Sequence, residues 1–298
     1  MSKLADEDLI EELRNRFRMN REALEELQEL NRELQIVNKK LEESESLKSH
    51  FISNITNEII NPFTSILGLA KHILSVKKED WKTVISMVAL IHSEAFNLDF
   101  QLRNIFVAAK IEAGEIYPEI LNVDVKTLIM NVLESFKFEA KKKYLDFSFI
   151  FDIKPPIGKT FYFKTDPEKL KLILSNLLSN AIKFSFEKQK IEIKAWMEND
   201  VLRTSVQDHG SGISEENQKK IFDRFKRLDS GINSINRGHG LGLSINKATL
   251  DLLNGSIDIN SEIGKGSRFT FAIPEAKADI AGFSTDGNEF LFDEEEIF

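Results

Sequence analysis

The segment Asp166-Pro-Glu-Lys-Leu-Lys-Leu-Ile-Leu-Ser-Asn-Leu-Leu-Ser-Asn-Ala-Ile-Lys-Phe184 predicts the helix around which the second half of the chain is organised. Asn176, Asn180 and Lys183 follow one another at steps of four and three. These steps place the three polar groups on one face of the helix, while leucines fill the other. Two carboxamides and an ammonium suit a magnesium-bound nucleotide, because amide oxygens can approach the metal and the lysine can reach phosphate. A solvated helix face is the alternative for such a triad taken alone.

Two glycine-rich motifs follow this helix. Asp208-His-Gly-Ser-Gly212 comes directly after a strand pattern. Asp208 can accept a hydrogen bond from an exocyclic amine, and Gly210 and Gly212 allow the backbone to approach a base closely. Gly238-His-Gly-Leu-Gly-Leu243 opens a helical pattern, where free backbone N–H groups and the helix N-terminus favour phosphate binding. The second motif is not a dinucleotide-binding fingerprint, because no strand leads directly into it.

The residues between the two motifs, 214–237, are numerous enough to form a lid over bound phosphates. They include the segment Ile221-Phe-Asp-Arg-Phe-Lys-Arg227, followed by a polar stretch. Its cations Arg224, Lys226 and Arg227 are candidates for contacts with phosphate.

Strand and helix patterns surround these motifs without a strict alternation of strand, helix and strand. This arrangement predicts an α+β fold, with helices on one face of a mixed sheet and a domain boundary near residues 115–122. The predicted strands are 145–153, 161–164, 190–196, 201–206 and 268–273, and the predicted helices are 125–143, 167–184, 215–226 and 241–253.

The first part of the chain has a helical pattern throughout. A polar break near residues 77–80 separates a helix ending at about Leu74 from one spanning Trp81 to Ile111, which predicts a helical hairpin. A lone hairpin would expose a broad apolar face, so two copies are expected to pair as a four-helix bundle. Upstream, apolar residues at alternating steps of three and four predict a coiled-coil seam, with a lone amphipathic helix as the alternative. The seam consists of Leu27, Leu30, Leu34, Val37 and Leu41.

The net charge of −8 is concentrated in one segment. Residues 275–298 hold eight acids and one lysine, whereas residues 1–274 balance 40 acids against 39 bases. A nearly neutral body argues against nucleic-acid binding, which needs clustered cations. The absence of cysteine excludes disulfides and thiolate metal sites. No apolar run approaches the ~20 residues of a membrane helix and no signal peptide is evident, so we expect a cytoplasmic protein without a membrane span.

The ordered set of asparagine motif, DxGxG, phenylalanine-containing segment and GxGxG resembles the ATP-binding domain of sensor histidine kinases. That domain belongs to a superfamily shared with gyrase, MutL and chaperone ATPases. The upstream hairpin resembles the dimerisation and phosphoacceptor domain of the same kinases, so the resemblance covers about residues 45–274. It implies a coiled-coil signalling helix (1–46), a dimerisation hairpin (47–116) and a Bergerat-type α/β sandwich (117–274). The acidic tail (275–298) lies outside the family pattern; we expect it to be disordered, with docking on the lid or on a partner as the alternative.

The resemblance also implies ATP and Mg²⁺ as cofactors and assigns roles to matching positions. Asn180 would be the metal ligand, beside Asn176 and Lys183, and Asp208 would accept a hydrogen bond from adenine N6. The remaining positions would shape the adenine pocket, bind phosphate or anchor the lid. They are Gly210, Gly212, Phe222, Arg224, Phe225, Arg227, Gly238, Gly240, Leu241 and Gly242.

One position departs from the family pattern. These kinases carry the phosphoacceptor histidine in a segment like S-N-x-S-H-E-[IL]-R-T-P, whereas this chain reads Ser53-Asn-Ile-Thr-Asn-Glu-Ile-Ile-Asn-Pro62, with Asn57 at the histidine position. An amide nitrogen is not a nucleophile, because its lone pair is delocalised into the carbonyl, so autophosphorylation there is expected to be absent. Ile60 also replaces the usual basic residue, and Asn61 stands where threonine is common. This favours natural divergence over an engineered acceptor, although both interpretations stay open, as does a substitute acceptor at His50.

Glu58 and Asn61 match the acid-x-x-[Thr/Asn] pattern that in this family orients water towards the aspartyl-phosphate of a response regulator. The alternative is that both are ordinary surface groups. The sequence thus predicts an enzyme of the protein histidine kinase family that acts through conformation, through phosphorylation in trans or as a regulator phosphatase. Its expected partners are a second copy of the chain, a receiver domain or another histidine kinase. A non-catalytic adaptor is the alternative, and the hairpin argues against a chaperone-like ATPase.

Overall fold

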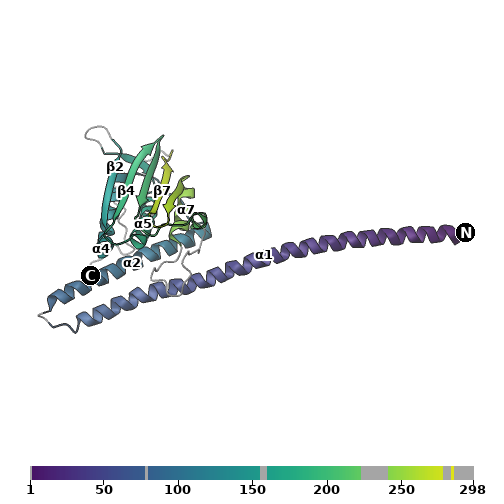
Figure 1. The fold of residues 1–298 in the computed structure, drawn as a ribbon, viewed down its shortest axis with the longest axis horizontal. Helices are drawn as coiled ribbons and strands as arrows, with labels where there is room; N and C mark the ends of the chain where they lie inside the picture. The colour runs from purple at the N-terminus through teal and green to yellow at the C-terminus, as the bar shows by residue number, and fades with distance from the viewer. Residues whose placement is uncertain (1, 78–79, 155–159, 223–240, 278–282, 285–298) are drawn as a thin grey trace. The chain divides into compact units, whose positions relative to one another are not determined.

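The computed structural model describes residues 2–77, 80–154, 160–222, 241–277 and 283–284 (Figure 1). The chain divides into two compact units, Met1–Asn54 and Ile55–Phe298. The predicted boundaries near residues 46 and 116 mark functional parts rather than compact units, and they stay predictions.

Two long helices make up the first part of the chain. Helix α1 spans Ser2–Ile73 and contains Pro62, and helix α2 spans Trp81–Ala113 (Figure 1). Gly114 ends α2 in the left-handed conformation, with φ of 69°, and its N–H donates to the carbonyls of Ile111 and Lys110. The predicted pair of helices with a break near residues 77–80 is therefore confirmed. None of the described helices has a stretch both apolar and long enough to cross a membrane.

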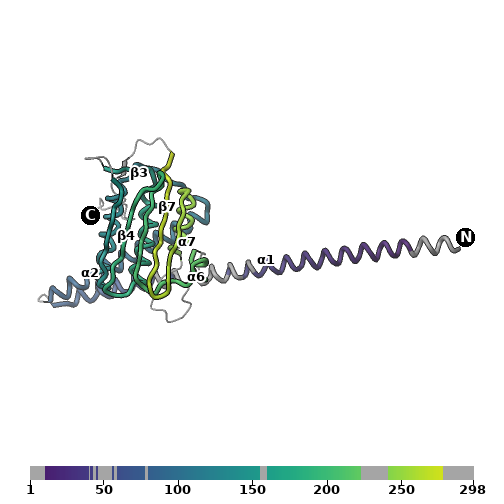
Figure 2. Tube along the Cα trace, turned by 45° about the horizontal axis from the view of Figure 1, so that its top comes forward, coloured from purple at the N-terminus to yellow at the C-terminus, as the bar shows by residue number. Residues whose placement is uncertain are grey.

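A mixed five-stranded sheet has the order β2-β4-β5-β7-β6, and its neighbouring strands lie side by side in Figure 2. β2 and β4 are parallel and the other pairs are antiparallel. Side chains of β4 alternate between buried and exposed, which is typical of a sheet covered by helices on one face. The strands are β2 (Asp146–Asp152), β4 (Lys190–Glu198), β5 (Val201–Gln207), β6 (Ser256–Glu262) and β7 (Gly266–Pro274).

Helices α3, α5 and α7 supply the apolar side chains that pack with the buried face of this sheet into one core. The segment predicted as one helix at 125–143 is instead divided at Phe136, which is buried and whose ring packs edge-on against Phe96 and Phe100 of α2. The prediction of a helix over 215–226 was also wrong in length, since α6 ends at Gln218 and turns follow to Phe222. The helices are α3 (Val125–Ser135), α4 (Lys137–Lys142), α5 (Pro167–Phe184), α6 (Glu215–Gln218) and α7 (Gly242–Leu252).

A second, three-stranded sheet has the order β3-β1-β8. β1 (Leu121–Asp124) pairs antiparallel with β3 (Tyr162–Thr165) and parallel with β8 (Phe283–Ser284). The expectation that the whole of 275–298 is disordered is therefore wrong for β8, because the free edge of β1 offers backbone groups that a further strand can satisfy. Residues 278–282 and 285–298 lie outside the described residues.

Asp166 joins the start of α5 to the segment before β1. Its carboxylate is 1% exposed and accepts hydrogen bonds from the backbone N–H groups of Lys169 (3.0 Å) and Glu119 (2.7 Å). It also forms an ion pair of 2.6 Å with the Lys169 ammonium. This one side chain thus caps α5 and fixes the incoming chain.

Replacing Asp166 with alanine should destabilise the fold more than removing the equivalent cap of α3. We expect Asp166→Ala to lower the free energy of unfolding by about 3 kcal/mol, because it leaves the half-buried Lys169 ammonium and two backbone donors without their acceptor. Asp124 accepts from Thr127 N and Thr127 Oγ1 in a half-buried position, so Asp124→Ala should cost only about 1 kcal/mol. Urea unfolding of both variants measures the difference, and equal losses would contradict this account.

Candidate nucleotide site

The carboxamide of Asn176 links helices α5 and α7. Its Nδ2 donates to Asn246 Oδ1 at 2.8 Å and to the Gly242 carbonyl at 3.4 Å. Asn246 Nδ2 in turn donates to the Ile173 carbonyl at 3.0 Å. Asn246 is completely buried and was not among the predicted site residues, because nothing in its local sequence distinguishes it from an ordinary helix residue.

Asn180 and Lys183 continue along the same helix from Asn176, and both are half-buried. The Lys183 ammonium lies 5.1 Å from the centre of the Phe184 ring. The predicted triad therefore lies on one helix, with only its first member deeply buried. The described residues contain no group of three or more His, Asp or Glu side chains that could hold a metal by themselves. Mg²⁺ fits such a site, since it commonly takes few protein oxygens and completes its coordination with phosphate and water.

Asp208 follows strand β5 and is 5% exposed. Its Oδ1 accepts a hydrogen bond of 3.0 Å from the backbone N–H of Gly210. Burial raises the pKa of Asp208 to about 6, against the lowering effect of hydrogen bonds from the backbone of Ser267 and Gly210 and of the charge of His209. The site therefore holds a carboxylate in surroundings that disfavour its charge, as is typical of functional groups rather than of structural ones.

Close backbone contacts around Asp208 require glycine at three positions. A Cβ atom at Gly210 would lie 1.9 Å from the Phe184 carbonyl oxygen, and one at Gly212, whose φ is +67°, would lie 2.0 Å from that of Glu262. Gly266 has a φ of +96°, and a Cβ atom there would lie 2.1 Å from the carbonyl oxygen of Asp208 itself. Gly266 was not predicted as a site residue, although the Gly-Lys-Gly turn between two strands could have indicated it.

Helix α7 begins at Gly242 with Leu241 as its N-cap, and no side chain caps its first N–H groups. A Cβ atom at Gly242 would lie 3.3 Å from Asn176 Oδ1, so this glycine lets the start of α7 approach α5 closely. Uncapped N–H groups at a helix N-terminus can bind an anion such as phosphate. Phe222 is half-buried and packs against the core. Five predicted site residues lie outside the described residues: Arg224, Phe225, Arg227, Gly238 and Gly240.

The other predicted site lies on helix α1. Asn57, Glu58 and Asn61 are all helical, and the side chain of Asn61 is exposed next to the buried Pro62. The side chains of Asn57 and Glu58 lie outside the described part of the structure.

The described residues of this nucleotide site lie within a segment that matches a known family. Residues 165–277 match the family described as "Histidine kinase-, DNA gyrase B-, and HSP90-like ATPase". Over 266 residues the chain is 32% identical to the sensor protein GacS of Pseudomonas syringae pv. syringae, covering 87% of this chain and 29% of that protein. It is 30% identical over 258 residues to the signal transduction histidine-protein kinase BarA of Escherichia coli (strain K12), covering 85% and 27%. These similarities support a member of the protein histidine kinase family.

A solved structure also resembles this histidine kinase. The crystal structure of full-length ShkA in complex with AMPPNP is 25% identical, with a TM-score of 0.54 over 79% of this chain and 47% of ShkA. The chain spans less than a third of the length of GacS and of BarA. The comparisons therefore identify the family and its ATPase domain. They do not establish the activity of the whole protein.

The raised pKa of Asp208 predicts that this residue lowers the stability of the fold at neutral pH. The folded state binds the proton with a pKa of about 6, against an ordinary value of 3.8, so the stability falls as the pH rises from about 4 through 6. Two pKa units correspond to about 3 kcal/mol. Asp208→Asn should therefore raise the free energy of unfolding at pH 8 by up to that amount, and by less than about 1 kcal/mol at pH 4.

Urea unfolding at the two pH values measures the effect, with Asp258→Asn on the exposed face of β6 as the control. The control should change stability little at either pH. A destabilised Asp208→Asn at pH 8 would show that the carboxylate is structural.

Proposed function

We propose that this histidine kinase is a two-component signalling protein that binds Mg-ATP between α5, α7 and Asp208 and does not phosphorylate itself at position 57. The observation that carries the proposal is the buried carboxylate of Asp208, held by backbone contacts that only glycine permits. A fold that needed Asp208 only for packing would gain stability from a neutral side chain. A charged residue at this position is explained if its carboxylate accepts a hydrogen bond from a ligand, such as one from the exocyclic amine of adenine.

We assign binding of the nucleotide's phosphates to α5 and the start of α7. Lys183 would contact phosphate, Asn180 would supply an amide oxygen to Mg²⁺, and Asn176 would keep the two helices at their observed separation through Asn246. Leu241 and Gly242 would present uncapped N–H groups to phosphate. Bound Mg²⁺ would neutralise phosphate charge during transfer of the γ-phosphoryl group. Arg224, Phe225, Arg227, Gly238 and Gly240 complete the proposed site.

The asparagine at position 57 limits which group can accept the γ-phosphoryl group of ATP. Its amide cannot attack the γ-phosphate, so the nucleotide site either acts as a conformational switch or phosphorylates a histidine of another kinase chain. A receiver domain or such a kinase is therefore the proposed partner. We infer no nucleic-acid partner, and a cytoplasmic location stays a prediction.

A second copy of the chain is the proposed dimerisation partner. The five seam residues of α1 are between 53% and 66% exposed in the single chain, a row of apolar groups that a coiled coil would bury. The hairpin formed by the end of α1 and by α2 would pair in the same dimer as a four-helix bundle.

The phosphorylation chemistry is tested with γ-labelled ATP. The native chain should remain unlabelled, whereas Asn57→His should gain acid-labile label, since the variant restores a nucleophile at the acceptor position. Asn57→His combined with Asn180→Ala is the control and should not be labelled, because it lacks the metal ligand.

Calorimetry should show that the native chain binds Mg-ATP at least tenfold more tightly than Asn180→Ala. Equal affinities would leave a non-catalytic adaptor, and label in the native chain that disappears in His50→Ala would place the acceptor at His50.

A second candidate activity is hydrolysis of the aspartyl-phosphate of a response regulator. The observation in its favour is that Asn61 is exposed on α1 three residues after Glu58, within one helical turn. A carboxylate and a carboxamide at this spacing can orient water for in-line attack without a histidine.

This activity predicts that the chain accelerates loss of phosphate from a phosphorylated receiver domain. Glu58→Ala and Asn61→Ala should each reduce the acceleration at least tenfold, because each removes one of the groups that position the water. Glu45→Ala, an exposed glutamate on the same helix, is the matched control and should leave the rate unchanged. Equal rates for all three variants would exclude this role.

A further inference from the structure

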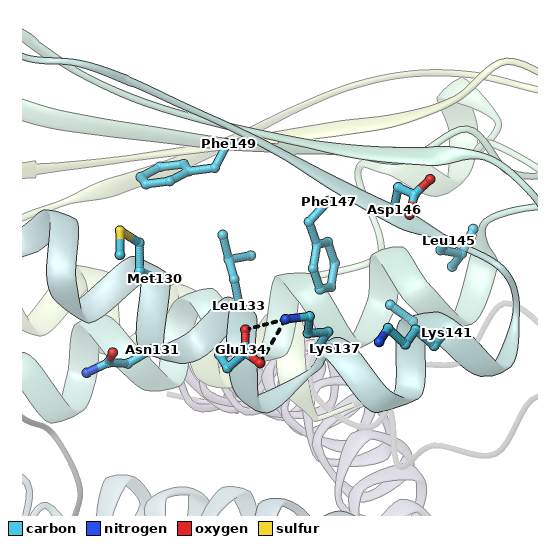
Figure 3. A pocket seen from close by; sticks show the side chains of 11 residues that line it. Met130, Asn131, Leu133, Glu134, Lys137, Lys141, Leu145, Asp146, Phe147 and Phe149 are labelled. Carbon is cyan, nitrogen blue, oxygen red and sulfur yellow. Dashed lines mark hydrogen bonds and ion pairs between the residues drawn. The ribbon is translucent and has the colours of Figure 1, made fainter.

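A groove of about 580 Å³ lies between helices α3 and α4 and the edge strand β2, outside the nucleotide site (Figure 3). Its upper wall in the view carries Phe147 and Phe149, whose rings point from β2 towards the helices, and Met130 and Leu133 lie below them. Met130 is 48% exposed, and the two phenylalanines are only half-buried. The groove therefore has an apolar floor and walls that the described residues leave partly uncovered.

Two lysines, Lys137 and Lys141, line the helical wall of the groove together with Glu134, and Asp146 lines the groove from β2 (Figure 3). Lys137 pairs with Glu134 at 2.9 Å across the exposed rim, whereas Lys141 makes no ion pair with any described residue. An occupant that combines apolar side chains with acids would cover the apolar part of the groove and give Lys141 a partner.

One segment of the chain itself has this composition. Residues 285–298 read Thr-Asp-Gly-Asn-Glu-Phe-Leu-Phe-Asp-Glu-Glu-Glu-Ile-Phe, with six acids, no base and five large apolar side chains. The stretch Phe290-Leu-Phe292 is followed at once by four consecutive acids. This order matches a groove whose apolar part, at Met130, precedes its lysines, at 137 and 141, along the helices.

The position of β8 puts this segment within reach of the groove. β8 runs parallel to β1, and β1 leads directly into α3, so the chain leaves Ser284 in the direction of the start of α3. Met130 lies five residues into α3, about 8 Å along its axis. Leu291 lies seven residues after Ser284 and can reach about 23 Å in an extended chain. The four acids that follow need to advance about 10 Å to reach the lysines, and three to four extended residues suffice.

We propose that residues 285–298 bind in the groove between α3, α4 and β2, with Phe290-Leu-Phe292 against Met130 and Phe149 and the acids at 293–296 beside Lys137 and Lys141. The acidic tail is then an intramolecular ligand of the ATP-binding domain. The proposal is independent of nucleotide binding and of the fate of Asn57.

Disulfide crosslinking tests this placement cleanly, because the native chain contains no cysteine. The test pair is Met130→Cys with Leu291→Cys. The matched control is Ile150→Cys with Leu291→Cys, since Ile150 is 55% exposed on β2 but points to the opposite face from Phe149. Under mild oxidation of the full chain, the test pair should crosslink at least tenfold faster than the control. Equal rates would overturn the proposal.

An equal mixture of ¹⁵N-labelled and unlabelled chains, analysed as crosslinked peptides by mass spectrometry, identifies whose tail is bound. Crosslinks within one chain are expected, and crosslinks joining labelled to unlabelled peptides would assign the groove to a second copy and overturn the intramolecular form. Lys137→Glu with Lys141→Glu should slow the test pair at least threefold. Lys265→Glu is the control, because Lys265 is an exposed lysine that also pairs with a nearby glutamate, at 2.7 Å from Glu262. An unchanged rate in the double variant would overturn the role of charge.

Discussion

The nucleotide site depends on one unfavourable placement, the burial of the Asp208 carboxylate at the end of strand β5. Water is replaced around it by backbone at close range, from Gly210 within its own loop and from Gly266 on the neighbouring turn. The backbone hydrogen bonds compensate only part of the lost hydration, which is why the pKa of the carboxyl stays raised. An acceptor prepared in this way can bind a donor from a ligand more strongly than a solvated carboxylate could, at a cost in stability.

The second constraint is the approach of α7 to α5. The chain from Asn176 through Asn246 to the Ile173 carbonyl fixes the two helices by hydrogen bonds that exclude water, and Gly242 removes the side chain that would separate them. The polar face of α5 and the N-terminus of α7 therefore lie together, joined by neutral amide groups. Neutral amide groups suit this purpose, because they connect the helices without adding charge beside a site meant for phosphate.

The sequence predicted these features unevenly, and the reason is physical. α5 was predicted with its observed bounds, because its leucine spacing, the capping Asp166 and the following proline are all local signals. β1, β6 and β8 were missed because each depends on pairing with a distant partner: β1 and β8 are short, and β6 alternates apolar and polar residues only weakly. Asn246 and Gly266 were missed for the same reason, since their contacts come from segments up to 73 residues away. The division of the predicted helix at Phe136 reflects packing against α2, which no local pattern contains.

The same distinction between local and distant signals applies to the tail. Its composition, acids mixed with large apolar residues, predicts disorder by default, with docking on the lid or on a partner as the alternative. A prediction from composition alone takes no account of the surfaces of the fold that lie near the tail. Because β8 pairs with β1, the proposed binding in the groove would be intramolecular, and the effective concentration of the segment at the groove would be far higher than that of a free peptide. Under this tether even a weak match of apolar and acidic groups suffices for binding, so a short strand of two residues changes the expectation for the fourteen that follow it.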